Sequence, residues 1–486
     1  MANFLKDPYI QEFIHPLLLR AWRGALQFNS QLEEPIKKAV MQRLLARAYM
    51  TKQPALKKRI LLAAKVENAF GLADILQARA SLKAYFPAAE IRVFSVSDLK
   101  STEGGFHCNL PSGLEQEAVV LLSGQQSYFE EANFSDGLNA ELKHEMEVQQ
   151  AKKALLAQAE RFIQACSDAC LVQYDTPLSK ELPGFEITNN GLGFTDAGIF
   201  INPMPAAAWI SHPVFALLFN KSQPTDKDLH QYKKQRVVYL NTFSHYSKRF
   251  EIFLYLAALF EQESNKEIDI LISYMELENF ELVGSLLEKA NIGKIVLIHP
   301  EEKNRSQVLY ENQIGKKTIR LLASALSPQM LLNLMPHSGP LVGIKDSQWL
   351  GNILSLKKIP ILEVAPHAKK SWNDLFALFS YLHLANWQKL AEELFDAARF
   401  GSDRIANNLF NLLKYSQTTE ETAQLTHFIR QYSSLEVTLG TLVSRWFWLK
   451  QNRELLHVEE QCLHEYVHGS SSAKNSVDRL IQSFKS

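Results

Sequence analysis

Residues 58–96, KRILLAAKVENAFGLADILQARASLKAYFPAAEIRVFSV, decide the fold class of this chain. The apolar run over residues 58–64 is too short for a helix and is typical of a buried strand. Residues 72–85 have helical spacing, Pro87 ends that pattern, and residues 91–96 have the composition of a second strand. A strand, a helix and a strand in this order predict a βαβ unit with parallel strands.

Further strands and one long helix are expected in the N-terminal half. Residues 118–123 and 171–174 have the composition of strands, and the charged segment 139–165 between them is expected to be a helix. Residues 183–205 are rich in Gly, Asn and Pro, which predicts loops flanking one short strand. The polar segment 222–235 is expected to link two domains.

A second series of alternating strands and helices begins at residue 237. Its expected strands are 237–242, 268–273, 295–299, 319–322, 341–343 and 361–364, and its expected helices are 250–261, 281–290, 328–334 and 347–356. This alternation predicts parallel strands joined by right-handed crossovers. Apolar spacing also predicts helices over residues 4–51 and from 372 to the end, with a polar break at 468–475.

The length of 486 residues exceeds what one hydrophobic core usually holds. We expect an α/β protein with two Rossmann-like domains that face each other across a cleft, and additional helices at both ends. The expected segments are a helical extension over 1–54, a first Rossmann-like domain over 55–225, a second over 236–370 and a helical segment over 371–486.

Composition excludes several classes of protein. Hydrophobic residues make up 46% of the chain, which argues against extensive disorder. Because 52 basic residues balance 52 acidic ones, no general field attracts nucleic acid or anionic lipid. No uninterrupted apolar stretch of about 18 residues predicts a membrane span. Four scattered cysteines and the lack of a secretion leader predict a cytoplasmic protein, or one in the host cytosol if it is delivered as an effector.

Candidate site residues follow the ends of the expected strands. Ligands bind parallel α/β sheets at this edge, where helix N-termini offer N–H groups to phosphate. Glu67 and Asn68 follow the first expected strand directly, and Gly71 permits a close turn into the next helix. Glu67 is therefore a candidate base at the cleft. The alternative is an ordinary solvated loop acid beside a helix cap.

A second candidate loop is GIKDSQ at residues 343–348. Its N–H groups, the Ser347 hydroxyl and the Lys345 ammonium form a candidate diphosphate cradle, with Gln348 beside them. Asp346 would orient a neighbouring donor or meet a sugar hydroxyl, because a carboxylate repels phosphate. Alternatively, Asp346 or Ser347 caps the following helix.

A third candidate loop follows the last expected strand. Glu363 is a candidate acceptor of hydrogen bonds from a ribose, and His367 and Lys369 are candidates for balancing phosphate charge. Basic residues beside a strand end are also common on ordinary surfaces.

A fourth candidate loop follows the strand expected at 237–242. It contains Ser244, His245, Lys248 and Arg249, for which a surface patch is the alternative interpretation. Each loop alone is weak evidence, but all four are expected at one cleft if the two halves face each other.

A different motif, HExxH, occupies residues 464–468 and on a helix places two imidazoles on one face for zinc. A zinc peptidase is therefore a further alternative. No histidine or glutamate follows, and only Asp478 remains as a third ligand, so a polar helix end is the preferred interpretation and no metal site is expected.

Two other features are interpreted as packing. Cys166 and Cys170 share a helix-like spacing without matching partners and are expected to be packed thiols. The aromatic residues at 446–448 and Tyr246 are expected to belong to the core, not to a base-stacking platform.

The chain resembles glycosyltransferases of the GT-B type. Residues 59–96 are similar to the βαβ unit that opens the acceptor side of their cleft, and residues 326–372 are similar to their donor side. With the intervening strands, the resemblance covers about 56–372. It implies two Rossmann-like domains facing across a cleft and a nucleotide-diphosphate sugar as the donor.

Within this class, local motifs resemble those of bacterial protein-arginine rhamnosyltransferases. The matching positions are Glu67, Asn68, Phe70, Gly71, Pro183, Gly184, Phe185, Gly193, Phe194, Thr195, Gly198, Asp346 and Ser347. The catalytic aspartate of that family directly follows the turn glycine, where this chain has Leu72. The first acid of the family's donor loop is replaced here by Lys345.

The resemblance implies transfer of a sugar from a nucleotide-diphosphate donor to a protein or other acceptor, without an obligatory metal. The expected catalytic residues are Glu67 and Asp346. The expected donor-binding residues are Ser244, His245, Lys345, Ser347, Gln348, Glu363, His367 and Lys369. The expected acceptor-side residues are Asn68, Gly71 and Asp196. The alternative from another class is a noncatalytic binding or scaffold protein on the same fold, which Leu72 favours.

Overall fold

The computed structural model describes most of the chain. The described residues are 3–50, 59–66, 69–97, 120–123, 169–174, 184–187, 191–202, 209, 212–243, 247–273, 284–300, 302, 304–324, 328–345, 349–363, 369–395, 401–414 and 416–485.

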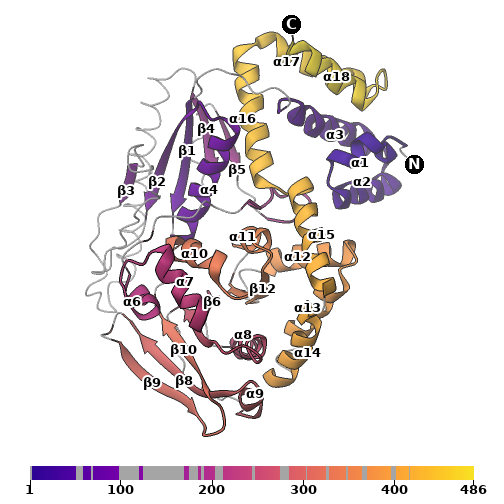
Figure 1. Ribbon diagram of the computed structural model, residues 1–486. Coiled ribbons are helices and arrows are strands. Elements are labelled where there is room, and N and C mark those ends of the chain that lie inside the picture. Colours follow the sequence, from indigo (N-terminus) through magenta and orange to yellow (C-terminus); the bar gives the residue numbers. More distant parts are fainter. Residues whose placement is uncertain are drawn as a thin grey trace, which may run out of the picture. The chain divides into compact units, whose positions relative to one another are not determined.

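These residues form two compact units, each with its own sheet (Figure 1). Unit 1 comprises the described residues up to Phe200 together with Ile429–Ser486, and unit 2 comprises Ile201–Phe428. The division falls inside one helix, α15 (Ser416–Tyr432). Both sheets are mainly parallel and are accompanied by many helices, which confirms the expected α/β class with Rossmann-like sheets.

The sheet of unit 1 has the strand order β3-β2-β1-β4-β5, and all of its strands are parallel. The strands are β1 (Arg59–Val66), β2 (Glu90–Ser97), β3 (Val120–Ser123), β4 (Ala169–Tyr174) and β5 (Gly184–Ile187). Helix α4 (Ala69–Tyr85) connects β1 to β2. The βαβ unit predicted from residues 58–96 is therefore confirmed.

The sheet of unit 2 has the order β12-β11-β6-β7-β10-β8-β9. The strands are β6 (Arg236–Asn241), β7 (Glu267–Ile272), β8 (Ile292–His299), β9 (Arg305–Glu311), β10 (Lys317–Ala323), β11 (Leu341–Ile344) and β12 (Ile359–Leu362). All pairs are parallel except β8 and β9, which form an antiparallel edge. Strand β9 was not expected from the sequence, because its largely exposed residues follow no apolar pattern.

Helices lie before, between and after the strands of unit 2. They are α6 (Pro213–Phe219), α7 (Asp226–Gln235), α8 (Lys248–Phe260), α9 (Gly284–Lys289), α10 (Pro328–Leu334), η3 (Met335–His337), α11 (Leu350–Ser355), α12 (Lys369–Tyr381), α13 (Ala385–Phe395), α14 (Ser402–Lys414) and the main part of α15. Helix α8 is buried on all sides from Phe250 to Leu259, as a helix without a polar face must be. It packs on α14 as well as on the sheet.

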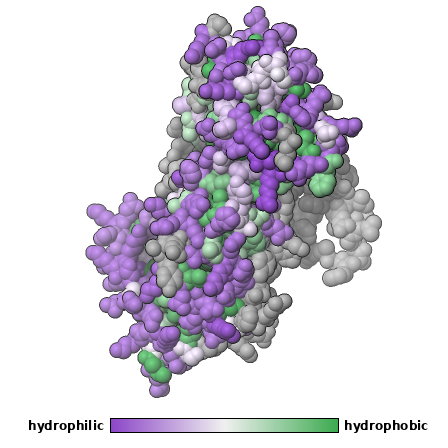
Figure 2. Space-filling view, turned by 90° about the vertical axis from the view of Figure 1, so that its right-hand side faces the viewer, coloured by the Kyte–Doolittle hydropathy of each residue, from purple (hydrophilic) through white to green (hydrophobic). Residues whose placement is uncertain are grey.

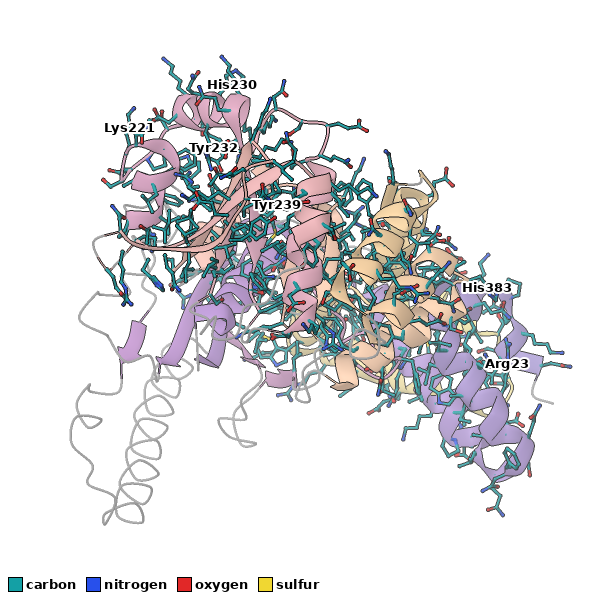
Figure 3. The ribbon with its side chains drawn as sticks, turned by 90° about the horizontal axis from the view of Figure 1, so that it is seen from below. Arg23, Lys221, His230, Tyr232, Tyr239 and His383 are labelled. Carbon is teal, nitrogen blue, oxygen red and sulfur yellow. The ribbon has the colours of Figure 1, made fainter. Side chains whose placement is uncertain are left out.

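The polar segment at 222–235, expected from the sequence to link two domains, is mostly helical, because residues 226–235 form α7. A capping box starts the helix: the side chain of Thr225 accepts from the backbone at Asp228, and the Asp228 carboxylate accepts from the Thr225 N–H. Leu229 and Tyr232 are buried on one side of α7, whereas His230 is exposed (Figure 3). The segment is thus an amphipathic helix of unit 2.

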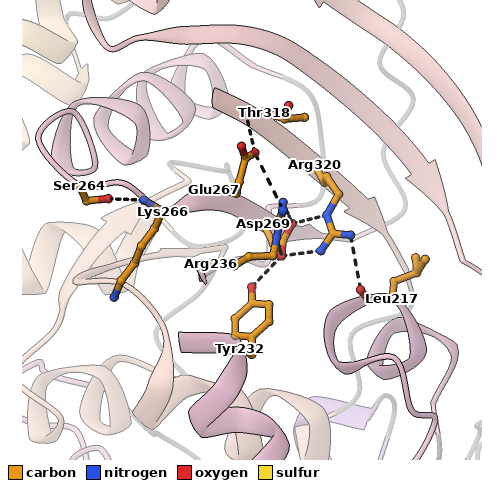
Figure 4. A network of polar contacts seen from close by, with 9 residues as sticks. All are labelled: Leu217, Tyr232, Arg236, Ser264, Lys266, Glu267, Asp269, Thr318 and Arg320. Carbon is orange, nitrogen blue, oxygen red and sulfur yellow. Dashed lines mark hydrogen bonds and ion pairs between the residues drawn. The ribbon is translucent and has the colours of Figure 1, made fainter. Parts of the chain in front are cut away.

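A buried ion network joins α7 to three strands (Figure 4). Asp269 on β7 is fully buried, and its carboxylate accepts hydrogen bonds from Arg236 at 2.8 and 2.8 Å and from Arg320 at 2.6 and 2.8 Å. The Tyr232 hydroxyl donates to the same carboxylate at 2.7 Å. Two guanidinium groups thus compensate one buried carboxylate. Removal of a charged partner would leave buried charge uncompensated and destabilise the unit.

The two ends of the chain build a separate hydrophobic cluster within unit 1. The N-terminal elements are η1 (Asn3–Lys6), α1 (Pro8–Phe13), α2 (Pro16–Phe28), η2 (Ser30–Leu32) and α3 (Glu33–Ala48), and the C-terminal ones are α16 (Leu435–Gln451), α17 (Arg453–Val467) and α18 (Ala473–Ser483). Residues of α1 to α3 share this cluster with α17 and α18. At its polar edge, Glu459 accepts hydrogen bonds from Tyr49 and from Arg445.

The described surface is mainly hydrophilic on the face shown in Figure 2, where hydrophobic residues lie in separate small areas. No helix among the described residues combines the length and the apolar composition that crossing a membrane requires.

Candidate functional site

The chain reverses its direction of travel across the unit 2 sheet at β6. This strand lies between β7, which follows it through α8, and β11, which is reached later from β10 through α10. In open α/β sheets such a switch point leaves a crevice at the carboxyl ends of the two central strands, and ligands bind there. The carboxyl ends of β6 and β11 are therefore the candidate site of unit 2.

Direct hydrogen bonds join these two strand ends. The Thr242 N–H donates to the Gly343 carbonyl at 2.8 Å, and the Thr242 hydroxyl lies 3.1 Å from the same oxygen. The Lys345 N–H in turn donates to Thr242 Oγ1 at 3.3 Å. Two loops that the sequence suggested separately, after residues 242 and 343, therefore begin side by side.

A glycine makes this close approach possible. A Cβ added at Gly343 would lie 2.4 Å from Asn241 Nδ2 and 3.2 Å from the Phe243 ring, so no larger residue fits without movement. Asn241 is fully buried, and its Oδ1 accepts from the Phe243 N–H at 3.0 Å. Its Nδ2 has no hydrogen-bond partner within the described part of the chain. A buried amide donor therefore lies at the seam between β6 and β11.

Helix α8 begins at the same edge of the sheet. Ser247 is its N-cap, with Oγ accepting from the Phe250 N–H at 3.4 Å. The expected helix start was residue 250, and the observed one is Lys248. The first turn of this helix of 13 residues carries the positive end of its dipole, which favours an anion in front of it.

Two charged residues, Glu363 and Arg249, lie near the start of α8. Glu363, which follows β12, is 5% exposed, and its backbone N–H and C=O are bonded to the Ile344 carbonyl and to Trp372 Nε1. Burial lowers the pKa of Arg249 on α8, and the nearby Glu363 carboxylate opposes this change. Arg249 also donates to the Leu394 carbonyl at 3.3 Å. The expected ribose acid thus lies near a partly buried guanidinium.

Several expected site residues lie outside the described residues. They are Glu67, Asn68, Ser244, His245, Asp346, Ser347, Gln348 and His367. The other three donor-side residues belong to unit 2. Lys345 directly follows β11, Glu363 directly follows β12, and Lys369 is the first residue of α12. The structure therefore brings together the backbones that flank three of the four expected loops.

Two expected helix starts are wrong. Gly71 does not turn the chain before a helix at Leu72, because α4 already begins at Ala69 and contains this glycine. Likewise, α11 does not begin with Asp346 or Ser347 as its cap: it begins at Leu350, has six residues and has Trp349 at the N-cap position. A helix this short offers little dipole to a phosphate, so α8 is the stronger anion-binding element.

The expected acceptor-side residue Asp196 lies in a tight turn of unit 1. Its Oδ2 accepts from the Gly193 N–H at 3.0 Å, and its own N–H donates to the Gly193 carbonyl at 2.9 Å. Gly191 and Gly198 close the turn as an antiparallel bridge. Asp196 therefore stabilises this turn. Its role toward an acceptor remains a prediction.

The HExxH motif lies at the end of α17. The rings of His464 and His468 are 4.2 Å apart between centroids, but Glu465 accepts from Arg479 at 2.6 Å and from Gln461 at 2.9 Å. Within the described ranges, no group of three or more His, Cys, Asp or Glu residues is placed to hold a metal ion. The glutamate forms ordinary surface contacts, as the polar helix end predicts.

Of the expected packing residues, Cys170 and Phe447 lie in the core, whereas Trp446 and Trp448 are only partly buried. Cys170 on β4 is fully buried, and burial raises the pKa of its thiol. Phe447 is 2% exposed, and Trp448 stacks on Phe484 with 4.7 Å between ring centroids. Cys166 and Tyr246 lie outside the described residues.

Sequence reasoning missed two residues of the candidate site. The sequence pattern assigns Asn241 and Thr242 to a strand, but β6 ends at Asn241 and Thr242 follows it. A polar pair closing an otherwise apolar run is a signal that the chain has reached the sheet edge.

Comparisons with known proteins give no family. No family model and no curated protein matches the chain. Solved structures that resemble it include the N-terminal domain of trehalose-6-phosphate phosphatase from Candida albicans, at 8% identity and a TM-score of 0.38 over 82% of this chain and 98% of that one. A spinosyn rhamnosyltransferase matches at 11% identity and 0.33 over 79% and 99%, and a glycosyltransferase in complex with dTDP at 11% and 0.35 over 80% and 99%. At these values the matches assign neither family nor activity.

Proposed function

We propose that the protein is a glycosyltransferase whose unit 2 binds a nucleotide-diphosphate sugar at the carboxyl ends of β6 and β11. The hydrogen bond from the Lys345 N–H to Thr242 Oγ1 carries this proposal, because it joins the loop after β11 to the end of β6, the strand that precedes α8. A diphosphate at that edge would meet the positive end of a helix and a lysine, which are usual partners of phosphate in α/β proteins.

Four of the expected donor-side residues have a task in this proposal. Lys345, Ser347 and Lys369 would stabilise the charge that develops on the departing diphosphate, a step at which fixed donors contribute most. Glu363 would accept a hydrogen bond from the ribose once the nucleotide is bound. Its neighbour Arg249 supports this, because it places a positive charge beside the carboxylate.

The acceptor side of the proposal rests on the resemblance of local motifs to bacterial protein-arginine rhamnosyltransferases. Glu67 would deprotonate the acceptor, and Asp346 would orient a donor or meet a sugar hydroxyl. Asn68, Gly71 and Asp196 would belong to the acceptor side. This resemblance suggests a protein side chain as the acceptor and rhamnose as the sugar of the donor.

A noncatalytic binding protein is the second candidate. One observation favours it: Leu72, at the position of the aspartate that is catalytic in the resembling family, lies inside the first turn of α4. A protein of this kind would bind the nucleotide at unit 2 and transfer nothing.

Calorimetry with UDP, GDP, dTDP and CDP tests the binding site. At least one nucleotide should bind, and Lys345→Met should weaken it about tenfold, because one charge-assisted contact is lost. Lys316→Met is the matched control, since this exposed lysine precedes β10 at the opposite end of the strands. Failure of all four nucleotides at millimolar concentration, or equal effects of the two variants, would remove the proposal.

Turnover separates the enzyme from the binding protein. Purified protein with the nucleotide sugar that matches the bound nucleotide should release nucleoside diphosphate, and Glu67→Gln should abolish release while nucleotide binding is retained. Binding without any release, with or without candidate protein acceptors, would favour the noncatalytic protein.

A further inference from the structure

Three basic side chains of unit 2 lie at the amino ends of its strands. They are Lys233 in the last turn of α7, His337 in η3 and Lys358 immediately before β12, and together they are called here the lysine–histidine cluster. Lys233 Nζ and His337 Nδ1 are 2.9 Å apart. Lys358 Nζ donates to the carbonyls of the two residues that follow His337, Ser338 at 2.7 Å and Gly339 at 3.1 Å.

The cluster contains more positive charge than its surroundings compensate. None of the described carboxylates forms an ion pair with Lys233, His337 or Lys358. The charged groups that influence them from neighbouring elements are Lys266 and Asp226, and only the second is an acid. Lys358 is 8% exposed, and a buried ammonium with carbonyl partners alone is held at a cost.

The titration of the cluster is consistent with this imbalance. Burial and then the charge of Lys233 lower the pKa of Lys358 to about 8. Burial and Lys266 lower the pKa of Lys233, and burial, Lys233 and Lys358 lower that of His337, against Asp226. An anion bound among the three groups would reverse these changes, so proton uptake and anion binding should favour each other.

We propose that the lysine–histidine cluster binds a doubly charged oxyanion, the phosphate group of a small molecule. Three basic side chains from separate parts of unit 2 interact there, and Lys233 and His337 are only partly buried, so a small anion has access from solvent. This site lies at the amino ends of the strands, whereas the proposed nucleotide site lies at their carboxyl ends. Each site stands or falls independently of the other.

Calorimetry with inorganic phosphate and with sulfate tests the site. One anion should bind per chain, and Lys233→Met and His337→Asn should each weaken it about tenfold or more. Lys234→Met is the matched control, because this exposed lysine is adjacent on α7 and belongs to no cluster. Lys345→Met should also leave anion binding unchanged, which separates this site from the nucleotide site.

The pH dependence gives a second measurement. Sulfate keeps its charge between pH 6 and pH 9, so any change in its affinity comes from the protein. Affinity should fall as the pH rises through about 8, where Lys358 loses its proton, and Lys358→Arg should shift this loss to higher pH. Absence of anion binding, equal weakening by Lys234→Met, or an affinity unchanged by Lys233→Met and His337→Asn would each overturn the proposal. A pyrophosphate or nucleotide that competes for the same site would identify the source of the phosphate.

Discussion

The backbone N–H of Lys345 donates to the hydroxyl of Thr242, a residue 103 positions earlier in the chain. The same hydroxyl lies within hydrogen-bonding distance of the Gly343 carbonyl. One buried side chain thus sets the start of the loop after β11 relative to the end of β6. The shape of the proposed nucleotide site should depend on it.

Thr242→Val removes this hydroxyl while keeping the shape of the side chain. We expect nucleotide affinity to fall several-fold, because the Lys345 N–H loses its acceptor and its loop gains freedom. Thr242→Ser retains the hydroxyl and should bind like the unchanged protein. Calorimetry with the best nucleotide of the panel measures both, and equal affinities of the two variants would show that the link does not shape the site.

The carboxylate of Asp269 should dominate the stability of unit 2. Burial raises the pKa of Asp269, but hydrogen bonds from Arg320 and Arg236 outweigh it and lower the pKa below its ordinary value. A lowered pKa means that this stabilisation is complete above about pH 4 and is lost as the pH falls through the folded-state pKa. Asp269→Asn leaves two arginines without their counter-charge and should lower the free energy of unfolding by about 3 kcal/mol or more.

Asp228→Asn is the control for this prediction in the same unit. Asp228 also pairs with a basic residue, Lys221, but on the surface, where such a pair contributes little to stability. Urea denaturation at pH 7 compares the two variants. A similar small loss for both would mean that the network of Figure 4 does not hold unit 2 together.

Gly198 should be irreplaceable for two separable reasons. Its φ is +108°, and an added Cβ would lie 2.3 Å from the Ser433 carbonyl oxygen, where the turn after Gly191 docks on the C-terminal helices. Gly198→Ala is expected to cost about 2–5 kcal/mol from backbone strain and overpacking together. Gly469 also has a positive φ, +77°, but nothing within 4 Å, so Gly469→Ala isolates the strain at about 1–2 kcal/mol. Thermal unfolding of both variants decides whether the close contact adds to the strain.

The sequence indicates the sheets well because buried parallel strands are short apolar runs. The run at 58–64 overlaps β1, and the helix expected at 328–334 coincides with α10. Elements that are mostly exposed lack such apolar runs, so the sequence pattern does not reveal them. Strand β9 carries mostly exposed residues without a pattern, and α7 is so polar that only its Thr225 and Asp228 capping box and its two buried residues mark it as a helix.

The candidate site is less predictable because its contacts join distant parts of the chain. Strand ends such as that before Lys345 can be found from local composition. The partner of Lys345 cannot, since Thr242 is brought to it only by the strand order β11-β6. The proximity of Arg249 to Glu363, and the shared core of the two chain ends, depend on tertiary packing in the same way.

His15 should make the helical cluster of the two chain ends sensitive to acid. Burial, with the charge of Arg43, lowers the pKa of His15 to about 4, and its Nδ1 accepts from the Leu17 N–H at 3.2 Å as the N-cap of α2. A folded-state pKa below the unfolded value of about 6.5 means that the unfolded chain takes up the proton more readily. Stability should therefore fall by up to about 3 kcal/mol as the pH drops from about 6.5 to about 4. His15→Asn keeps an N-cap acceptor and removes the titration, so the difference in unfolding free energy between the two proteins should shrink or reverse over this window. Chemical denaturation at pH 7, 6 and 5 measures it, and parallel curves for both proteins would exclude His15 as the titrating group.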